Sequence, residues 1–265
     1  MKYARALTIA GSDSGGGAGI QADLKTFQEL GVFGMSALTA VTAQNTLGVH
    51  GVYPMSLEAL ENQIDAVAAD LPPAAIKTGM LFNSDMIELV ARKVKEYDWN
   101  QVVIDPVMVA KGGQSLLQEE AVEALIEQLL PLSYVITPNL PEAEALVGMS
   151  VQTIEDRKLA AKKLHQKGAR HVVIKGGHGK EGDQVIDLLF DGENFTEFES
   201  QRIQTKHTHG TGCTYAAAIT AEIAKGKSVK DAVNTAKQFI QAAIEHTLEF
   251  GEGHGPTNHW AYNEK

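Results

Sequence analysis

The sequence of 265 residues contains only one cysteine, Cys213, which excludes an intramolecular disulfide and indicates a reducing compartment. Basic residues are also scarce, because 23 Lys and Arg stand against 33 Asp and Glu, for a net charge of −10 at pH 7. This acidic balance argues against a nucleic-acid partner, whose phosphate backbone attracts a basic surface. A local cationic pocket for a small phosphate is compatible with it.

Long apolar runs are missing as well. No stretch of about 18 consecutive apolar residues occurs, so the sequence predicts no membrane-spanning helix and no membrane partner. The apolar run within residues 1–11 is too short for a signal peptide followed by a cleavage site. We therefore expect a soluble, cytoplasmic protein. Since no Pro/Ser-rich linker, charge block or internal repeat occurs, we expect a single domain over residues 1–265 rather than two small ones.

Short apolar runs alternate with amphipathic segments along the chain. The pattern predicts strands at 6–10, 36–43, 74–77, 102–104, 134–136 and 172–174, and helices at 21–30, 57–69, 86–97, 121–130, 153–165, 212–224 and 231–247. Segments 185–190 and 195–198 predict a hairpin across a turn at 191–194. We therefore expect an α/β fold: a mostly parallel sheet covered by helices on both faces, with antiparallel strands at its edge.

Ligands of such sheets bind beyond the carboxyl ends of the strands, where two Gly-rich segments lie. The first, residues 11–19 (GSDSGGGAG), follows a strand and opens a helix, but it matches neither G-x-G-x-x-G nor a P-loop. It is either a ligand-binding loop or a flexible turn. The second comprises Gly210, Thr211, Gly212 and Cys213, ahead of an apolar helix. Their N–H groups predict a nest for a transferring phosphoryl group.

The helix that follows this nest should also affect the ionisation of the lone cysteine. A first-turn position should stabilise a thiolate at Cys213, and a capped helix with an inert cysteine is the alternative. His207 and His209 precede the nest by a few residues. Because they lie two residues apart on a Gly-rich loop, we expect them to pack or face solvent rather than bind a metal.

Charged and amide side chains follow several predicted strands. Asp105 and Glu142 could supply carboxylates for a nucleotide-bound Mg²⁺, or merely cap a loop and a helix. Lys175 could neutralise a nucleotide phosphate or remain solvated, and Lys77 is equally ambiguous. Gln44 could read the edge of a heterocycle through its amide, with turn formation as the alternative.

In this order the motifs resemble the ribokinase-like small-molecule kinases, and more closely the hydroxymethylpyrimidine/phosphomethylpyrimidine kinases. Single motifs are weak, but the ordered set covers nearly the whole chain. The segments that carry the resemblance are 6–13, 16–25, 43–46, 77–81, 103–108, 137–142, 175–178 and 208–214.

The resemblance implies an activity in thiamine biosynthesis. ATP would phosphorylate the 5-hydroxymethyl group of 4-amino-5-hydroxymethyl-2-methylpyrimidine (HMP), and the same site would convert HMP phosphate to the diphosphate. It implies Mg²⁺ as cofactor and a homodimer, and it leaves the use of a monovalent cation open. The pyridoxal kinases of the cysteine-containing type are the alternative, and Gln44 discriminates because its amide matches the donor and acceptor of an aminopyrimidine. A non-catalytic pyrimidine sensor would lack the nest or the acids, and both are present.

The resemblance also assigns residues to roles. The anion hole would consist of Gly210, Thr211, Gly212 and Cys213, and the Mg²⁺ site of Asn139 and Glu142, acting through water, with Asp105 nearby. The nucleotide would contact Lys175, Thr205 and Lys237. The pyrimidine would contact Gln44, Gly11, Ala18 and Asp23, with Met80 and Val107 as apolar walls. Without the resemblance, Asp23 would be assigned to a solvated helix face. Residues 41–53 are expected to form a mobile flap over the substrate.

The one departure from the wider superfamily concerns the catalytic base. Many ribokinase-like enzymes have an aspartate where this chain has Cys213. A loose phosphoryl-transfer transition state needs little prior deprotonation of the acceptor, and HMP phosphate is already an anion. We therefore expect Cys213 to assist the first phosphorylation more than the second.

Overall fold

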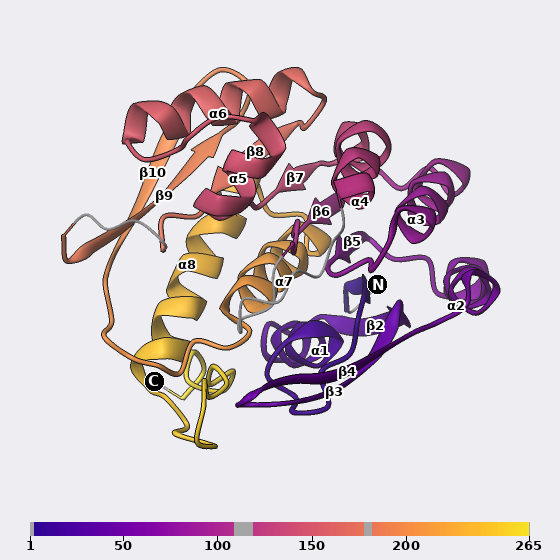
Figure 1. Ribbon diagram of the computed structural model, residues 1–265, viewed down its shortest axis with the longest axis horizontal. Coiled ribbons are helices and arrows are strands. Elements are labelled where there is room, and N and C mark those ends of the chain that lie inside the picture. Colours follow the sequence, from indigo (N-terminus) through magenta and orange to yellow (C-terminus); the bar gives the residue numbers. More distant parts are fainter. Residues whose placement is uncertain (1–2, 109–118, 178–181, 265) are drawn as a thin grey trace.

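A large central sheet runs through the middle of the molecule (Figure 1). The computed structural model describes residues 3–108, 119–177 and 182–264. Its strand order is β10-β9-β8-β7-β6-β5-β1-β2. The neighbours from β8 through β7, β6, β5 and β1 to β2 pair in parallel, whereas β9 pairs antiparallel with both β8 and β10. The strands are β1 (Arg5–Ala10), β2 (Phe33–Leu38), β5 (Ala75–Thr78), β6 (Val102–Ile104), β7 (Val135–Ile136), β8 (His171–Ile174), β9 (Gln184–Phe190) and β10 (Phe195–Gln201). The predicted α/β class and antiparallel edge are confirmed.

Helices cover both faces of this sheet. Along β6, Val102 and Ile104 belong to one apolar core and Val103 belongs to the other, because successive side chains point to opposite faces. All three are buried, which explains why the strand reads as a continuous apolar run. One core is closed by α2 (Leu57–Asp70), α3 (Ser84–Glu96), α4 (Glu119–Ala124), α5 (Leu140–Val147) and α6 (Ile154–Gln166), and the other by α1 (Gly19–Glu29), α7 (Thr211–Ala224) and α8 (Val229–Glu245).

The predicted strand over 36–43 is wrong, because the chain leaves the main sheet within it. Strand β2 ends at Leu38, and the next strand, β3 (Ala40–Asn45), pairs antiparallel with β4 (Gly48–Pro54) in a separate two-stranded sheet. Buried Thr39 forms the bend: its N–H bonds Ala10 O at 3.0 Å and its hydroxyl donates to Met80 O at 2.7 Å. A run of β-favouring residues gives no sign of such a bend. The β3–β4 hairpin spans the segment that was predicted to be a flap.

Helix boundaries mostly follow their capping residues. The Thr153 and Asp156 capping box starts α6, close to the predicted start of that helix at 153, and Ser228 caps α8. The predicted helix over 121–130 is instead α4, followed by a π turn (Leu125–Leu129) and a 3-10 turn (Leu130–Leu132). Proline does not end this helical stretch, because Pro131 occupies the first turn of the 3-10 segment, where its missing N–H costs nothing. Within the part of the chain that the structure describes, no helix has the length and apolar character of a membrane span.

Candidate active site

A cavity of about 930 Å³ opens beyond the carboxyl ends of the parallel strands. The loops after β1, β5, β6, β7 and β8 line it, together with the β3–β4 hairpin and the start of α7. Gln44 and Cys213 both lie in its wall, although 169 positions separate them in the numbering (213 − 44). Of the residues assigned by resemblance, it brings together Gly11, Ala18, Gln44, Met80, Asp105, Val107, Asn139, Glu142, Lys175, Thr205, Gly210, Thr211, Gly212, Cys213 and Lys237.

The nest at residues 210–213 depends on one glycine. Gly210 is the N-cap of α7 and has a φ of +84°, in the left-handed region that side chains rarely adopt. A Cβ at this position would also collide with Gly17 O. No side chain caps this helix within the described part of the chain. The Thr211 N–H group bonds Thr208 O at 3.3 Å, whereas the N–H groups of Gly212 and Cys213 meet no acceptor among the described residues and are available to an anion in the cavity.

The environment of Cys213 overturns the prediction that its thiolate is stabilised. Burial raises the pKa of the Cys213 thiol to about 11, and the nearby Lys77 ammonium offsets only part of that rise. Asp23 and Asp105 raise the pKa further through their negative charge. Without ligands, Cys213 is therefore a neutral thiol at physiological pH, able to donate a hydrogen bond rather than to accept a proton.

Asp23 is buried, so the prediction of a solvated helix face is wrong, whereas its predicted contact with the substrate stays a prediction. Its side chain is 0% exposed and it forms an ion pair with Lys77 at 2.9 Å. Thr8 also donates a hydrogen bond to Asp23 Oδ2 at 2.6 Å. Burial lowers the pKa of Lys77, but the attraction of Asp23, the hydrogen bond to it and the negative charge of other nearby groups together outweigh burial and keep that pKa above its ordinary value. The cavity wall therefore carries a permanently charged ammonium beside Cys213.

A second cation lies among the acidic groups at the ends of β6 and β7. Lys175 Nζ is 3.1 Å from Asp105 Oδ1 and 3.9 Å from Glu142 Oε2. Asn139 and Glu142 form a capping box at the start of α5, which uses Asn139 Oδ1 and Glu142 Oε2 for backbone N–H groups. Burial raises the pKa of Glu142 to about 7, an increase that Lys175 opposes and Asp105 enhances.

This acidic cluster is chemically suited to a hard divalent cation. Asp105 Oδ2 is buried and has no hydrogen-bond partner among the described residues, which leaves this carboxylate oxygen of the cavity wall open to a cation. Mg²⁺ keeps several waters and needs only one or two carboxylates when it binds with a nucleotide. Among the described residues no group of three His, Cys, Asp or Glu could hold a metal alone, so the remaining ligands would be water and phosphate oxygens.

The far end of the cavity contains Lys237, which is already paired. Its Nζ donates to Asp187 Oδ2 at 2.8 Å and to Val185 O at 3.1 Å. Asp187 also accepts a hydrogen bond from Gly176 N at 2.7 Å, so one carboxylate joins α8 to the turn after β8. Sequence reasoning missed Asp187, because it lies within an ordinary alternating strand. His178, the last residue of the motif at 175–178, lies outside the described residues.

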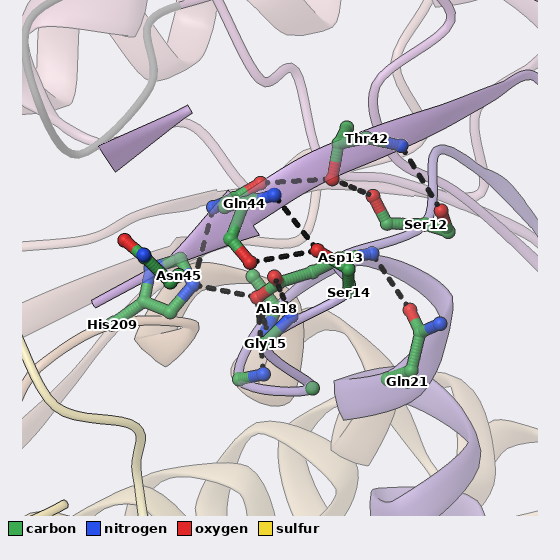
Figure 2. A network of polar contacts seen from close by, with 12 residues as sticks. Ser12, Asp13, Ser14, Gly15, Ala18, Gln21, Thr42, Gln44, Asn45 and His209 are labelled. Atoms are coloured by element: carbon green, nitrogen blue, oxygen red, sulfur yellow. Dashed lines mark hydrogen bonds and ion pairs between the residues drawn. The ribbon is translucent and has the colours of Figure 1, made fainter. Parts of the chain in front are cut away.

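Around the first Gly-rich loop, polar groups form a continuous network (Figure 2). Asp13 accepts hydrogen bonds from the N–H groups of Gly15, Gly17 and Ala18 at 2.8–3.0 Å, so this loop is a fixed turn rather than a flexible one. His209 Nε2 is 2.7 Å from Asp13 Oδ2. Burial raises the pKa of Asp13, but His209 and the backbone donors outweigh burial and hold that pKa below its ordinary value.

His209 is therefore neither solvent-facing nor a simple packing residue. It is 9% exposed, lines the cavity and lies 3.3 Å from Gln44 Nε2. Ser14 fixes the backbone of Gln44 from the other side, through hydrogen bonds of 2.7 Å to its N–H and carbonyl groups. The sequence signal that could have revealed this network is an aspartate inside a Gly-rich turn, a position where a carboxylate binds free N–H groups.

Comparison with known proteins adds independent findings. The family model described as phosphomethylpyrimidine kinase matches residues 13–258. The hydroxymethylpyrimidine/phosphomethylpyrimidine kinase of Bacillus subtilis is 63% identical over 262 residues, 99% of this chain and 97% of the relative. Its counterpart in Haemophilus influenzae is 56% identical and covers 97% of each chain. The crystal structure of Bacillus subtilis pyridoxal kinase with ADP is 48% identical, with a TM-score of 0.93 and coverage of 99% of this chain and 100% of that one.

Proposed function

Because the chain belongs to the phosphomethylpyrimidine kinase family, we propose that its cavity holds an aminopyrimidine and ATP side by side. The protein is an ATP-dependent kinase of thiamine biosynthesis that converts HMP to its monophosphate and the monophosphate to the diphosphate. The observation that carries the proposal is the shared wall of one cavity: a side chain able to read a heterocycle, Gln44, and a phosphoryl-binding nest at residues 210–213.

At the substrate end, the amide of Gln44 reads the pyrimidine edge. Its oxygen accepts a hydrogen bond from the exocyclic amine, and its nitrogen donates one to the adjacent ring nitrogen. The remaining contacts are apolar or come from small residues that allow close approach. These are Gly11, Ala18, Met80 and Val107.

The nest receives the equatorial oxygens of the transferring phosphoryl group. Fixed N–H groups at a helix N-terminus stabilise the charge of the transition state without reorganising. Lys77, held charged by Asp23, adds a positive charge on the same side of the cavity. The neutral thiol of Cys213 orients the hydroxymethyl group by a hydrogen bond. Because the transition state is loose, the hydroxyl proton passes late, to an oxygen of the transferred phosphoryl group, while the bond to the leaving ADP breaks.

At the nucleotide end, Lys175 and Thr205 lie toward the phosphates, and Lys237 supports this end through Asp187. Asp105 and Glu142 would hold Mg²⁺, together with Asn139 through water, and the ion would offset the charge of the ATP phosphates. Burial lowers the pKa of Lys175, but Asp105 and Glu142 outweigh burial and raise it, so this lysine stays charged.

Pyridoxal kinase activity is the second candidate, because the Bacillus subtilis pyridoxal kinase is similar to this chain in both fold and sequence. Two facts favour the pyrimidine. The identity to the Bacillus subtilis pyrimidine kinase is 63%, against 48% to the pyridoxal kinase of the same organism. The amide of Gln44 matches adjacent donor and acceptor atoms of an aminopyrimidine, whereas pyridoxal presents a phenolic oxygen.

Three further properties belong to this proposal. We expect a homodimer, which the resemblance implies, and sedimentation velocity would test it. We expect the protein to work in the cytoplasm, consistent with the single cysteine. Dependence on a monovalent cation would appear as a change in ADP release when sodium replaces potassium.

Substrate selectivity tests the assignment. Wild-type protein with Mg-ATP should release ADP faster with HMP than with pyridoxal, and Gln44→Ala should reduce kcat/KM for HMP about tenfold or more. Its effect on pyridoxal should be smaller, since pyridoxal lacks the paired donor and acceptor. Equal losses on the two substrates would count against Gln44 as the pyrimidine reader.

A further inference from the structure

The hydrogen bonds around Gln44 decide which way its amide points. The side chain has two polar neighbours in the network of Figure 2: His209 Nε2 lies 3.3 Å from Gln44 Nε2, and Thr42 Oγ1 lies 3.3 Å from Gln44 Oε1. The oxygen and nitrogen of a carboxamide have nearly the same shape, so the character of these neighbours assigns them.

His209 Nε2 offers no acceptor to Gln44. Asp13 Oδ2 already accepts hydrogen bonds from the N–H groups of Gly17 and Ala18, and it lies 2.7 Å from His209 Nε2. An ionised carboxylate only accepts hydrogen bonds, so His209 Nε2 carries a proton whether the imidazole is neutral or charged. An amide N–H group facing this N–H group would be repulsive.

Thr42 must present an acceptor to Gln44. Its hydroxyl lies 2.8 Å from Ser12 O, a carbonyl oxygen that can only accept, so the hydroxyl proton points there. What remains toward Gln44 is a lone pair on Thr42 Oγ1, which faces the amide atom at 3.3 Å. Turning the amide by 180° resolves both conflicts. The oxygen then faces the His209 Nε2–H group, which it shares with Asp13, and the nitrogen donates to Thr42 Oγ1.

We propose that Asp13 and His209 are positioning residues that fix the amide of Gln44 with its oxygen on the His209 side and its nitrogen on the Thr42 side. One lone pair and one N–H group are then used internally. The other lone pair and N–H group lie next to each other on the outer edge of the amide, and Gln44 lines the cavity. This inference rests on the proposed contact between Gln44 and the pyrimidine.

The fixed amide orients the substrate. The exocyclic amine of an aminopyrimidine pairs with the amide oxygen and so lies on the His209 side, and the ring nitrogen lies on the Thr42 side. In HMP the hydroxymethyl group is attached to the carbon next to the one that carries the amine. It therefore also lies on the His209 side, and His209 directly precedes the nest at residues 210–213. The opposite amide orientation would turn the hydroxymethyl group toward Thr42.

Kinetics of three variants test this role. His209→Leu removes the donor and should lower kcat/KM for HMP about tenfold, whereas His209→Gln, whose amide N–H reaches a similar point, should stay within about threefold. In a Gln44→Ala background, His209→Leu should add less than about twofold, because the two residues act through one contact. The KM for ATP and the melting temperature report whether the variants are folded.

The analogue that lacks the exocyclic amine separates positioning from a general structural effect. His209→Leu should lower kcat/KM for this analogue less than about threefold, since the bond it weakens is already missing. Equal losses with HMP and the analogue, or a tenfold loss that persists in the Gln44→Ala background, would overturn the inference. Failure of the wild-type protein to release ADP with HMP would instead overturn the proposed function.

A wild-type structure gives a test that no variant can compromise. In crystals grown with HMP and a non-hydrolysable ATP analogue, the exocyclic amine and the hydroxymethyl group should both lie on the His209 side of Gln44. A ring nitrogen on the His209 side would overturn the inference.

Discussion

Replacing Asp23 by asparagine should destabilise the protein strongly, although Asp23 does not line the cavity. The carboxylate is the ion-pair partner of Lys77 at 2.9 Å, and both side chains are 0% exposed. Removing one member of a buried ion pair leaves an uncompensated charge and costs about 3–5 kcal/mol. That loss is a large part of the roughly 5–15 kcal/mol by which a domain is normally stable. Urea denaturation followed by circular dichroism at neutral pH measures it.

A double variant distinguishes the stability lost with the ion pair from the stability lost through a general folding defect. Asp23→Asn with Lys77→Met removes both charges, so it should be at least about 2 kcal/mol more stable than the sum of the two single losses predicts. Lys158→Met is the matched control, because its pair with Glu155 at 2.8 Å lies at the surface, and it should change the stability far less than Asp23→Asn does. Strictly additive losses, or a cost for Asp23→Asn no larger than that of the control, would refute the reasoning.

Three further outcomes follow from the site. Cys213→Ala should slow phosphorylation of HMP about tenfold more than that of HMP phosphate, whose acceptor is already anionic; separate assays giving equal losses would contradict this. In metal-free protein the pKa of Glu142 is about 7 when folded, against an ordinary value of 4.5, so the folded state binds the extra proton. The contribution of Glu142 to stability should therefore fall by roughly 3 kcal/mol from about pH 4.5 to 7. Urea denaturation should show this difference between the pH profiles of the wild type and of Glu142→Gln, and identical pH profiles would refute it. Gly210→Ala should reduce kcat about a hundredfold in a folded protein, because its Cβ collides with Gly17 O; near-normal turnover would exclude the nest.

Much of the fold could be predicted because buried parallel strands and capped helices leave local signals. Strand β6 reads as three consecutive apolar residues, and Thr153 with Asp156 marks the start of α6. The turn out of the main sheet at Thr39 leaves no such signal, since the hydrogen bonds that form it come from Ala10 and Met80.

The predictions that failed at the site depend on contacts between distant parts of the chain. Asp23 is buried because it pairs with Lys77, 54 positions away, and Asp13 meets His209 across 196 positions. The pKa of Cys213 follows from the same cause, because burial opposes the thiolate that the helix N-terminus was expected to favour. Residue type and spacing identified the groups at the cavity, whereas their protonation and partners are set by packing.

The most direct test of the central claim is phosphorus NMR of the protein with Mg-ATP and HMP. ADP and HMP phosphate should appear first, and the diphosphate of HMP should accumulate afterwards in the same tube. A spectrum in which ATP remains unchanged with HMP, while pyridoxal is phosphorylated under identical conditions, would contradict it.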